Sequence, residues 1–167
     1  SWEIIMTFRN GRPKLTDLWS KLGATAKSSA QKGEDLVLSL PSGRSLVYKT
    51  CRFRRVPTKE GGGSEVVGEI VRNGVGQTTR IHQGILIENL CQSIARDAFR
   101  DCLLAVNDAG WRVIFHVHDE LIVEVPKEKA DEAKQQILSI MARSPKWAKH
   151  LPVEAEATVA EKYSQAK

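Results

Sequence analysis

The stretch that most constrains the fold runs from Arg112 to Val125 and reads RVIFHVHDELIVEV. Apolar side chains recur at every second position in both halves of this stretch, which is the period of a half-buried β-strand. Between the two halves lie three polar residues, His118, Asp119 and Glu120. Because aspartate tolerates turn conformations, the pattern predicts two antiparallel strands that fold back at these residues.

The tip of such a hairpin carries two adjacent carboxylates and an imidazole. Neighbouring negative charges repel each other unless a positive charge offsets them. Magnesium prefers carboxylate oxygens and is usually held by one or two carboxylates together with substrate phosphates. The hairpin therefore suits a metal ion held by Asp119 and Glu120 against a phosphate. An ordinary solvated turn is the alternative interpretation.

The segment HVHDELIVEVP resembles motif C of the family A, or DNA polymerase I-like, DNA polymerases, in which Val-His-Asp-Glu separates two apolar strands. The downstream sequence also fits, with a helix, a proline-bounded connection and an alternating strand close to the chain terminus. Upstream, the compact phage or prophage-type members of that family are similar to the segments FRNGRPKLTDLWSKL, LPSGRSLVY and IHQGILIENLCQSIARDAF. The resemblance covers nearly the whole chain.

This resemblance implies the C-terminal palm part of a template-directed DNA polymerase, which extends primer-template DNA with dNTP by two-metal chemistry. It implies that Asp119 ligates Mg²⁺, that Glu120 ligates it more weakly or tunes the nearby water, and that His118 lies near the primer terminus. The family's metal-binding aspartate in motif A and its nucleotide-binding helix, motif B, have no counterpart in this sequence. The fragment alone is therefore expected to bind Mg²⁺ weakly and to be inactive without the remaining fingers, thumb and motif A segment.

The positive charge of the chain is concentrated in one region. The net charge is +5, and residues 44–80 hold an excess of basic over acidic residues of the same size. Such a concentration attracts a phosphate backbone. Arg52, Arg54, Arg55 and Arg80 are therefore candidate contacts to DNA phosphates, and a solvated basic surface is the alternative.

The strongest helical pattern runs from Gly84 to Asn107, where apolar residues recur at every third or fourth position. In the family the corresponding helix runs under the DNA, and its polar residues touch the template-primer. The resemblance therefore suggests that the amides of Asn89 and Gln92 donate to minor-groove acceptors. A solvated helix face would explain the same residues.

The remaining patterns predict further helices and strands. They are one or two helices over 2–22 interrupted at Pro13, a helix tail and loop over 23–33, a hairpin over 35–48, an exposed connection over 51–77, a helix over 127–143 and a last strand over 153–159. The expected fold is α+β, an antiparallel β-sheet with helices packed on one face, as in a polymerase palm. The resemblance divides it into a helical segment, 1–34, that follows the missing motif B, and a palm subdomain, 35–167.

The composition, with 41% hydrophobic and 27% charged residues, is typical of a folded globular protein. The apolar runs are too short for a bilayer and the start lacks the layout of a signal peptide, so we expect no membrane partner and a cytoplasmic location, in a bacterial host if the chain is phage encoded. The cysteines lack the spacing of a zinc site. Two rival functions are a palm-like module that binds nucleic acid without catalysis, and a metal-dependent phosphohydrolase built on Asp119, Glu120 and His118.

Overall fold

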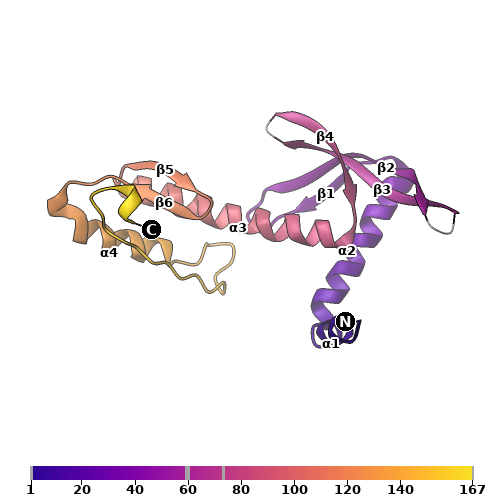
Figure 1. The fold of residues 1–167 in the computed structure, drawn as a ribbon, viewed down its shortest axis with the longest axis horizontal. Coiled ribbons are helices and arrows are strands. Elements are labelled where there is room, and N and C mark those ends of the chain that lie inside the picture. The colour runs from indigo at the N-terminus through magenta and orange to yellow at the C-terminus, as the bar shows by residue number, and fades with distance from the viewer. Residues whose placement is uncertain (1, 59–60, 73, 167) are drawn as a thin grey trace. The chain divides into compact units, whose positions relative to one another are not determined.

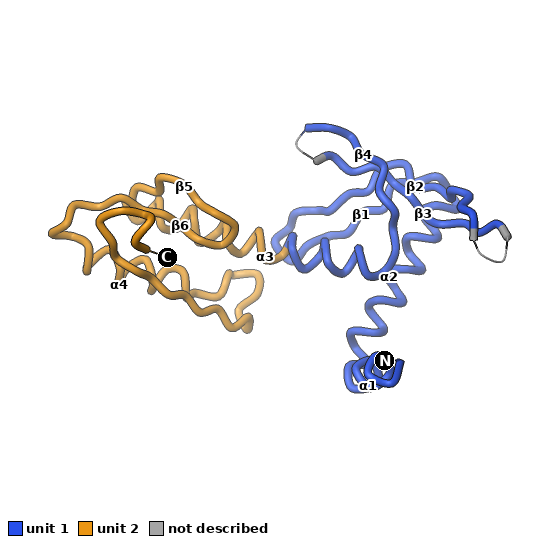
Figure 2. Tube along the Cα trace, viewed as in Figure 1, with its two compact units in different colours: residues 1–93 blue, residues 94–167 orange. Residues whose placement is uncertain are grey.

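The computed structural model describes residues 2–58, 61–72 and 74–166. The chain forms two compact units, residues 1–93 and 94–167 (Figure 2), and each is considered by itself. Its elements are α1 (Trp2–Asn10), α2 (Pro13–Lys32), β1 (Leu36–Ser39), β2 (Ser45–Thr58), β3 (Gly61–Arg72), β4 (Val75–Ile81), α3 (Gln83–Asp108), β5 (Val113–Val117), β6 (Glu120–Val123), η1 (Lys127–Lys129), α4 (Ala130–Met141) and η2 (Tyr163–Gln165) (Figure 1). The expected α+β class is confirmed. The predicted functional division after residue 34 stays a prediction.

The helix α2 begins and ends at residues whose backbones suit those positions. Pro13 lies in its first turn, where the missing N–H would have no helical partner in any case. Gly33 ends it in the left-handed conformation, with φ of 71°. The prediction of a loop within 23–33 was wrong, because the helix continues to Lys32. Small buried residues, Ala26 and Ala30, hold this last part of the helix in the core.

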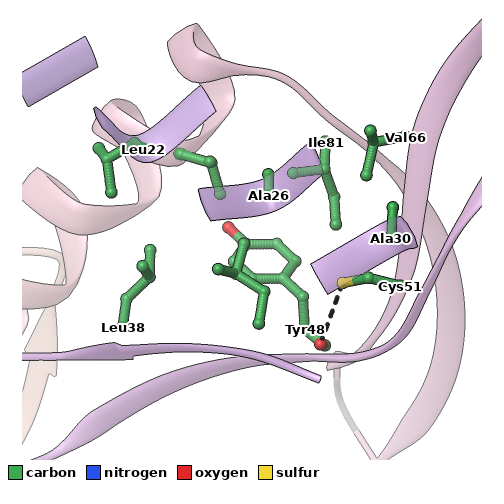
Figure 3. Close-up of a cluster of buried hydrophobic side chains, with 10 residues drawn as sticks. Leu22, Ala26, Ala30, Leu38, Tyr48, Cys51, Val66 and Ile81 are labelled. Atoms are coloured by element: carbon green, nitrogen blue, oxygen red, sulfur yellow. Dashed lines mark hydrogen bonds between the residues drawn. The ribbon is translucent and has the colours of Figure 1, made fainter. Parts of the chain in front are cut away.

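The first unit contains a four-stranded antiparallel sheet in the order β1-β2-β3-β4. Helices α2 and α3 pack with these strands around a single core (Figure 3). Within it Cys51 donates its S–H to the Tyr48 carbonyl at 3.4 Å. The buried members of this core are Leu22, Ala26 and Ala30 from α2, Leu36 and Leu38 from β1, Tyr48 and Cys51 from β2, Val66 from β3, Ile81 from β4 and Leu86 from α3. The predicted hairpin over 35–48 is confirmed as β1 and the start of β2.

The connection predicted over 51–77 is instead a long β-ribbon, so that prediction was wrong for the described residues; 59, 60 and 73 lie outside them. Strands β2 and β3 pair from Lys49 and Glu69 outward to Thr58 and Gly61. Beyond the core, side chains such as Phe53 remain exposed, so the ribbon lacks the apolar alternation of a half-buried strand. Backbone pairing and cross-strand charge pairs hold the ribbon, and hydrophobic periodicity does not report either interaction.

A β-bulge between Lys49 and Arg52 interrupts the regular pairing of β2, and Cys51 within it is buried in the core. Within the bulge Thr50 has a φ of 50°, a left-handed conformation that is strained for a β-branched residue. Its backbone N–H donates to Asp35 Oδ1 at 2.8 Å, which holds the bulge against the residue that precedes β1. On the facing strand a Cβ at Gly68 would lie 2.8 Å from Ile81 Cδ1, so the Ile81 side chain would have to shift to admit a larger residue.

We expect Thr50→Gly to raise the free energy of unfolding by about 0.5–1 kcal/mol, because glycine adopts the left-handed conformation without strain. Urea denaturation followed by circular dichroism measures the change. Thr78→Gly, at an exposed position of regular strand in β4, is the matched control and should lower stability by roughly 0.5–1 kcal/mol. If both variants lost stability equally, the bulge would not be strained.

The second unit joins the C-terminal half of α3 to a hairpin of β5 and β6 and to α4. Trp147 Nε1 donates to Asp101 Oδ2 at 2.8 Å, which ties the connection after α4 to α3. The Phe99 ring of α3 lies against His116 of β5, with centroids 5.6 Å apart. The helix predicted over 127–143 is confirmed as η1 followed by α4. No helix within the described part of the chain is both long and apolar enough to cross a membrane.

The last strand predicted over 153–159 was wrong as a strand, although its side-chain alternation is present. Val153, Ala155 and Ala157 are half-buried while Glu154 and Glu156 are exposed, yet the segment pairs with no strand among the described residues. Period-two alternation reports which face of an extended chain is covered. It does not report whether a neighbouring strand is there to complete the ladder.

Acid should destabilise this unit through Asp101. A hydrogen bond from Arg100 lowers the pKa of Asp101 below its ordinary value of 3.8, partial burial opposes that shift, and the Trp147 indole N–H adds to it. A carboxyl group whose pKa is lower in the folded state stabilises the fold above the unfolded value, and this contribution is lost as the pH falls through the folded value.

We therefore expect the free energy of unfolding to fall as the pH decreases below about 3.8. Urea titrations at a series of pH values should show a shallower fall for Asp101→Asn, which retains an oxygen for the Trp147 indole. Asp131→Asn, which removes an exposed carboxylate at the start of α4, controls for the loss of one charge. An acid dependence in Asp101→Asn equal to that of the unaltered chain would contradict this account.

Candidate functional site

The hairpin of β5 and β6 presents the predicted acidic residues at its turn. Val117 pairs with Glu120, so only His118 and Asp119 connect the two strands. His118 has a φ of 52°, so histidine rather than aspartate takes the left-handed conformation that a tight turn needs. The side chains of His118, Asp119 and Glu120 are all exposed. The predicted hairpin is confirmed, although β5 is more exposed than the half-buried strand that its alternation indicated.

Glu120 has a partner that the sequence did not reveal. The Tyr163 hydroxyl donates to Glu120 Oε2 at 3.3 Å, and the Tyr163 ring lies edge-on to Phe115 of β5, with centroids 5.4 Å apart. The chain after α4 therefore returns to the hairpin and restrains one of its two carboxylates. Tyr163 stands 43 residues beyond Glu120, and no spacing rule connects residues so far apart.

These carboxylates offer some of the oxygen donors that a magnesium ion would need. Asp119 offers hard oxygen donors beside solvent, and Glu120 follows it directly on the next strand. Within the described ranges, no group of three or more His, Cys, Asp or Glu side chains is arranged to hold a metal ion. The donor set thus fits an ion whose other ligands are water, substrate phosphates or further protein oxygens.

Three of the four predicted phosphate-binding arginines lie on one face of the first unit's sheet. Glu65 lies between two of them: Arg54 Nε donates to Glu65 Oε1 at 3.0 Å, and Arg80 Nε lies 3.0 Å from Glu65 Oε2. Arg54 Nη2 also pairs with Glu65 Oε1. Arg52 Nη1 lies 3.6 Å from Glu69 Oε1. The glutamates therefore offset much of the positive charge that the sequence located here.

Arg55 is separated from the other arginines. Adjacent residues of a strand point to opposite faces of the sheet, so Arg55 lies on the face opposite Arg54. In the register Arg55 pairs with Ser64, whereas Arg54 pairs with Glu65. The arginines that are consecutive in the sequence do not form one basic patch.

The two predicted amides on α3 differ in their surroundings. Asn89 Nδ2 donates to the hydroxyl of Tyr48 at 2.6 Å, and Tyr48 is fully buried in the core. Gln92 is exposed. His82 fixes the start of this helix, because its Nδ1 accepts the backbone N–H of Gly84 at 3.2 Å. Asn89 thus links α3 to β2, whatever else its amide contacts.

We expect Asn89→Ala to lower the free energy of unfolding by about 1 kcal/mol, because it removes a hydrogen bond to a buried hydroxyl. Gln92→Ala, one turn further along the same helix, should change stability by less than about 0.5 kcal/mol. Thermal or urea unfolding measures both. If Asn89→Ala were as stable as Gln92→Ala, the bond to Tyr48 would not support the fold.

The predicted site residues thus form two groups. His118, Asp119 and Glu120 are brought together at the hairpin of the second unit. The first unit holds the other six, Arg52, Arg54, Arg55, Arg80, Asn89 and Gln92. Sequence reasoning missed Tyr163, Glu65 and Glu69. The two glutamates lie beside arginines through the strand register, which the prediction of a connection over 51–77 could not supply.

Comparison with known proteins gives a consistent result. The chain is 27% identical over 180 residues to a DNA polymerase of Bacillus phage SP02, an alignment that covers 98% of this chain and 27% of that protein. It is 33% identical over 144 residues to the chloroplastic DNA polymerase I A of Oryza sativa subsp. japonica, covering 86% of this chain and 13% of that protein. The mitochondrial DNA polymerase I B of the same plant is 27% identical over 106 residues.

No protein-family model matches the chain, and no solved structure matches it significantly. The chain spans about a quarter of the phage relative and a smaller share of the plant relatives. The predicted resemblance to DNA polymerase I-like proteins is nevertheless confirmed, since two plant DNA polymerases I and the phage DNA polymerase align with 60% or more of this chain. The chain is similar to a segment of such polymerases.

Proposed function

We propose that this chain, similar over nearly its whole length to a segment of DNA polymerase I-like proteins, is the C-terminal palm part of a template-directed DNA polymerase of family A. Its hairpin would be motif C, and a phage or prophage-type parent fits the phage relative. The observation that carries the proposal is the exposed Asp119 at a two-residue turn between paired strands. A carboxylate in that position is accessible to a metal ion and to DNA at once.

In this proposal Asp119 holds Mg²⁺ through its carboxylate, and Glu120, restrained by Tyr163, holds it more weakly or orders the adjacent water. Mg²⁺, when bound, would neutralise the negative charge on the attacking and leaving oxygens of nucleotidyl transfer. The exposed imidazole of His118 lies at the same turn and can donate a hydrogen bond to the primer terminus. Each residue keeps the role that the resemblance implied.

The substrates in this proposal are primer-template DNA and dNTP, and the partners are the fingers, thumb and motif A segment of the full enzyme. Arg52, Arg54, Arg80 and, on the opposite face, Arg55 would contact backbone phosphates, which position DNA without reading its sequence. The exposed Gln92 amide on α3 would donate to minor-groove acceptors of the DNA. The N–H of the Asn89 amide that does not bond Tyr48 would do the same.

We expect the isolated chain to be inactive, because two-metal chemistry needs more carboxylate ligands than this hairpin provides. Primer extension with labelled primer-template, dNTP and Mg²⁺ should give no incorporation above an Asp119→Ala control. Incorporation that the Asp119→Ala substitution abolishes would show that the chain is a complete catalyst and would contradict the proposed inactivity.

The rival function, a nucleic-acid-binding module without catalysis, makes a different prediction for metal. It expects DNA affinity that depends on salt but is unchanged by Mg²⁺ and by Asp119→Asn. A polymerase part should instead bind primer-template more tightly with Mg²⁺ present, and Asp119→Asn should remove that increase. Release of phosphate or nucleotides from generic phosphate esters would favour a phosphohydrolase over both.

A further inference from the structure

One face of the sheet in the first unit carries alternating positive and negative side chains. We call Arg52, Arg54, Glu65, Glu69 and Arg80 the arginine-glutamate face. Strand register brings them together: Arg54 pairs with Glu65 across β2 and β3, while Arg52 and Arg80 flank Val67 from either side. Residues that pair directly across antiparallel strands share a face, so all three guanidinium groups lie on the same side of the sheet.

Glu65 lies deeper in this face than the arginines that contact it. Its side chain is 13% exposed, whereas the side chains of Arg54 and Arg80 are 54% and 62% exposed. Its two oxygens contact different arginines. Oε1 contacts Arg54 of β2, and Oε2 contacts Arg80 of β4. Glu69 is 49% exposed and lies 3.6 Å from Arg52, a looser pair. Glu65 is therefore the central negative charge of the face.

The arginines keep binding capacity despite these pairs. A guanidinium group has five N–H donors, so each arginine can hold a carboxylate and still donate to a second anion. Val67 beneath them is fully buried, which indicates that the aliphatic stems of Arg52 and Arg80 cover it. Packing of these stems adds to the charge pairs in restraining the guanidinium groups.

We propose that Glu65 restrains the DNA affinity of this chain: it lowers the positive charge that backbone phosphates meet at Arg54 and Arg80 without displacing either arginine. The inference rests on the proposed function, since it requires that the arginine-glutamate face binds DNA. A carboxylate and a phosphate compete for the same guanidinium donors. Removing the negative charge of Glu65 strengthens attraction to the phosphate backbone and increases its dependence on salt.

Glu65→Gln tests this role, because glutamine keeps an oxygen acceptor for Arg54 while the face gains one unit of positive charge. Fluorescence anisotropy with a labelled primer-template duplex, across a series of NaCl concentrations, gives the dissociation constant and its salt slope. We expect binding to tighten about threefold to tenfold at low salt and the slope to steepen. Glu128→Gln makes the same charge change at an exposed position of η1 in the second unit and is the matched control.

Glu69→Gln provides a second test if Glu65→Gln folds poorly, which circular dichroism and thermal unfolding would show. Glu69 is half exposed, so its replacement cannot disturb the core. The effect should have the same direction and a smaller size, because Glu69 pairs with only one arginine of the face. Binding by Glu69→Gln no tighter than by Glu128→Gln would count against the proposal.

The outcomes separate this inference from the proposed function. Tighter binding by Glu65→Gln than by Glu128→Gln supports the role of Glu65. Equal binding, or weaker binding by Glu65→Gln, overturns that role and leaves the proposed polymerase function standing. If the unaltered chain showed no salt-dependent affinity for primer-template DNA, both proposals would fail together.

Discussion

The register of two short antiparallel strands fixes the position on which the proposed function depends. Because Val117 pairs with Glu120, the turn contains only His118 and Asp119, and the side chains of Asp119 and Glu120 are both exposed. A shift of one residue would exchange the faces of every side chain in the hairpin. The turn requires a left-handed residue, and His118 supplies it. Asp119 therefore stays at an exposed tip, beside the carboxylate that Tyr163 restrains.

Charge is organised differently in the two units. In the second unit the hairpin presents two adjacent carboxylates to solvent, an arrangement that favours a cation. In the first unit Arg52, Arg54 and Arg80 are paired with glutamates, and Glu65 lies between Arg54 and Arg80. A basic region identified from sequence alone thus overstates the positive potential of the folded surface, because cross-strand carboxylates offset it. Phosphate binding on such a surface depends on whether a guanidinium group that already contacts a carboxylate can also donate to a phosphate.

Hydrophobic periodicity predicted the helices α3 and α4, the β1-β2 hairpin and the acidic turn, since each has an apolar stripe or face of its own. It failed for the β2-β3 ribbon, whose outer part is held by backbone pairing and by Arg54-Glu65 rather than by burial. It also failed to distinguish the extended segment 153–159 from a paired strand. Contacts between distant residues, such as Asn89 with Tyr48, leave no pattern in one sequence, because packing alone brings them together.

The proposed function depends most directly on whether Asp119 holds a divalent cation. The most direct measurement is an amide NMR spectrum of the chain titrated with Mn²⁺, which occupies magnesium sites and broadens nearby signals. We expect broadening centred on residues 117–121 that Asp119→Asn largely abolishes. Broadening centred on another acidic pair, such as Asp97 and Asp101 on α3, or broadening at the hairpin that survives Asp119→Asn, would contradict it.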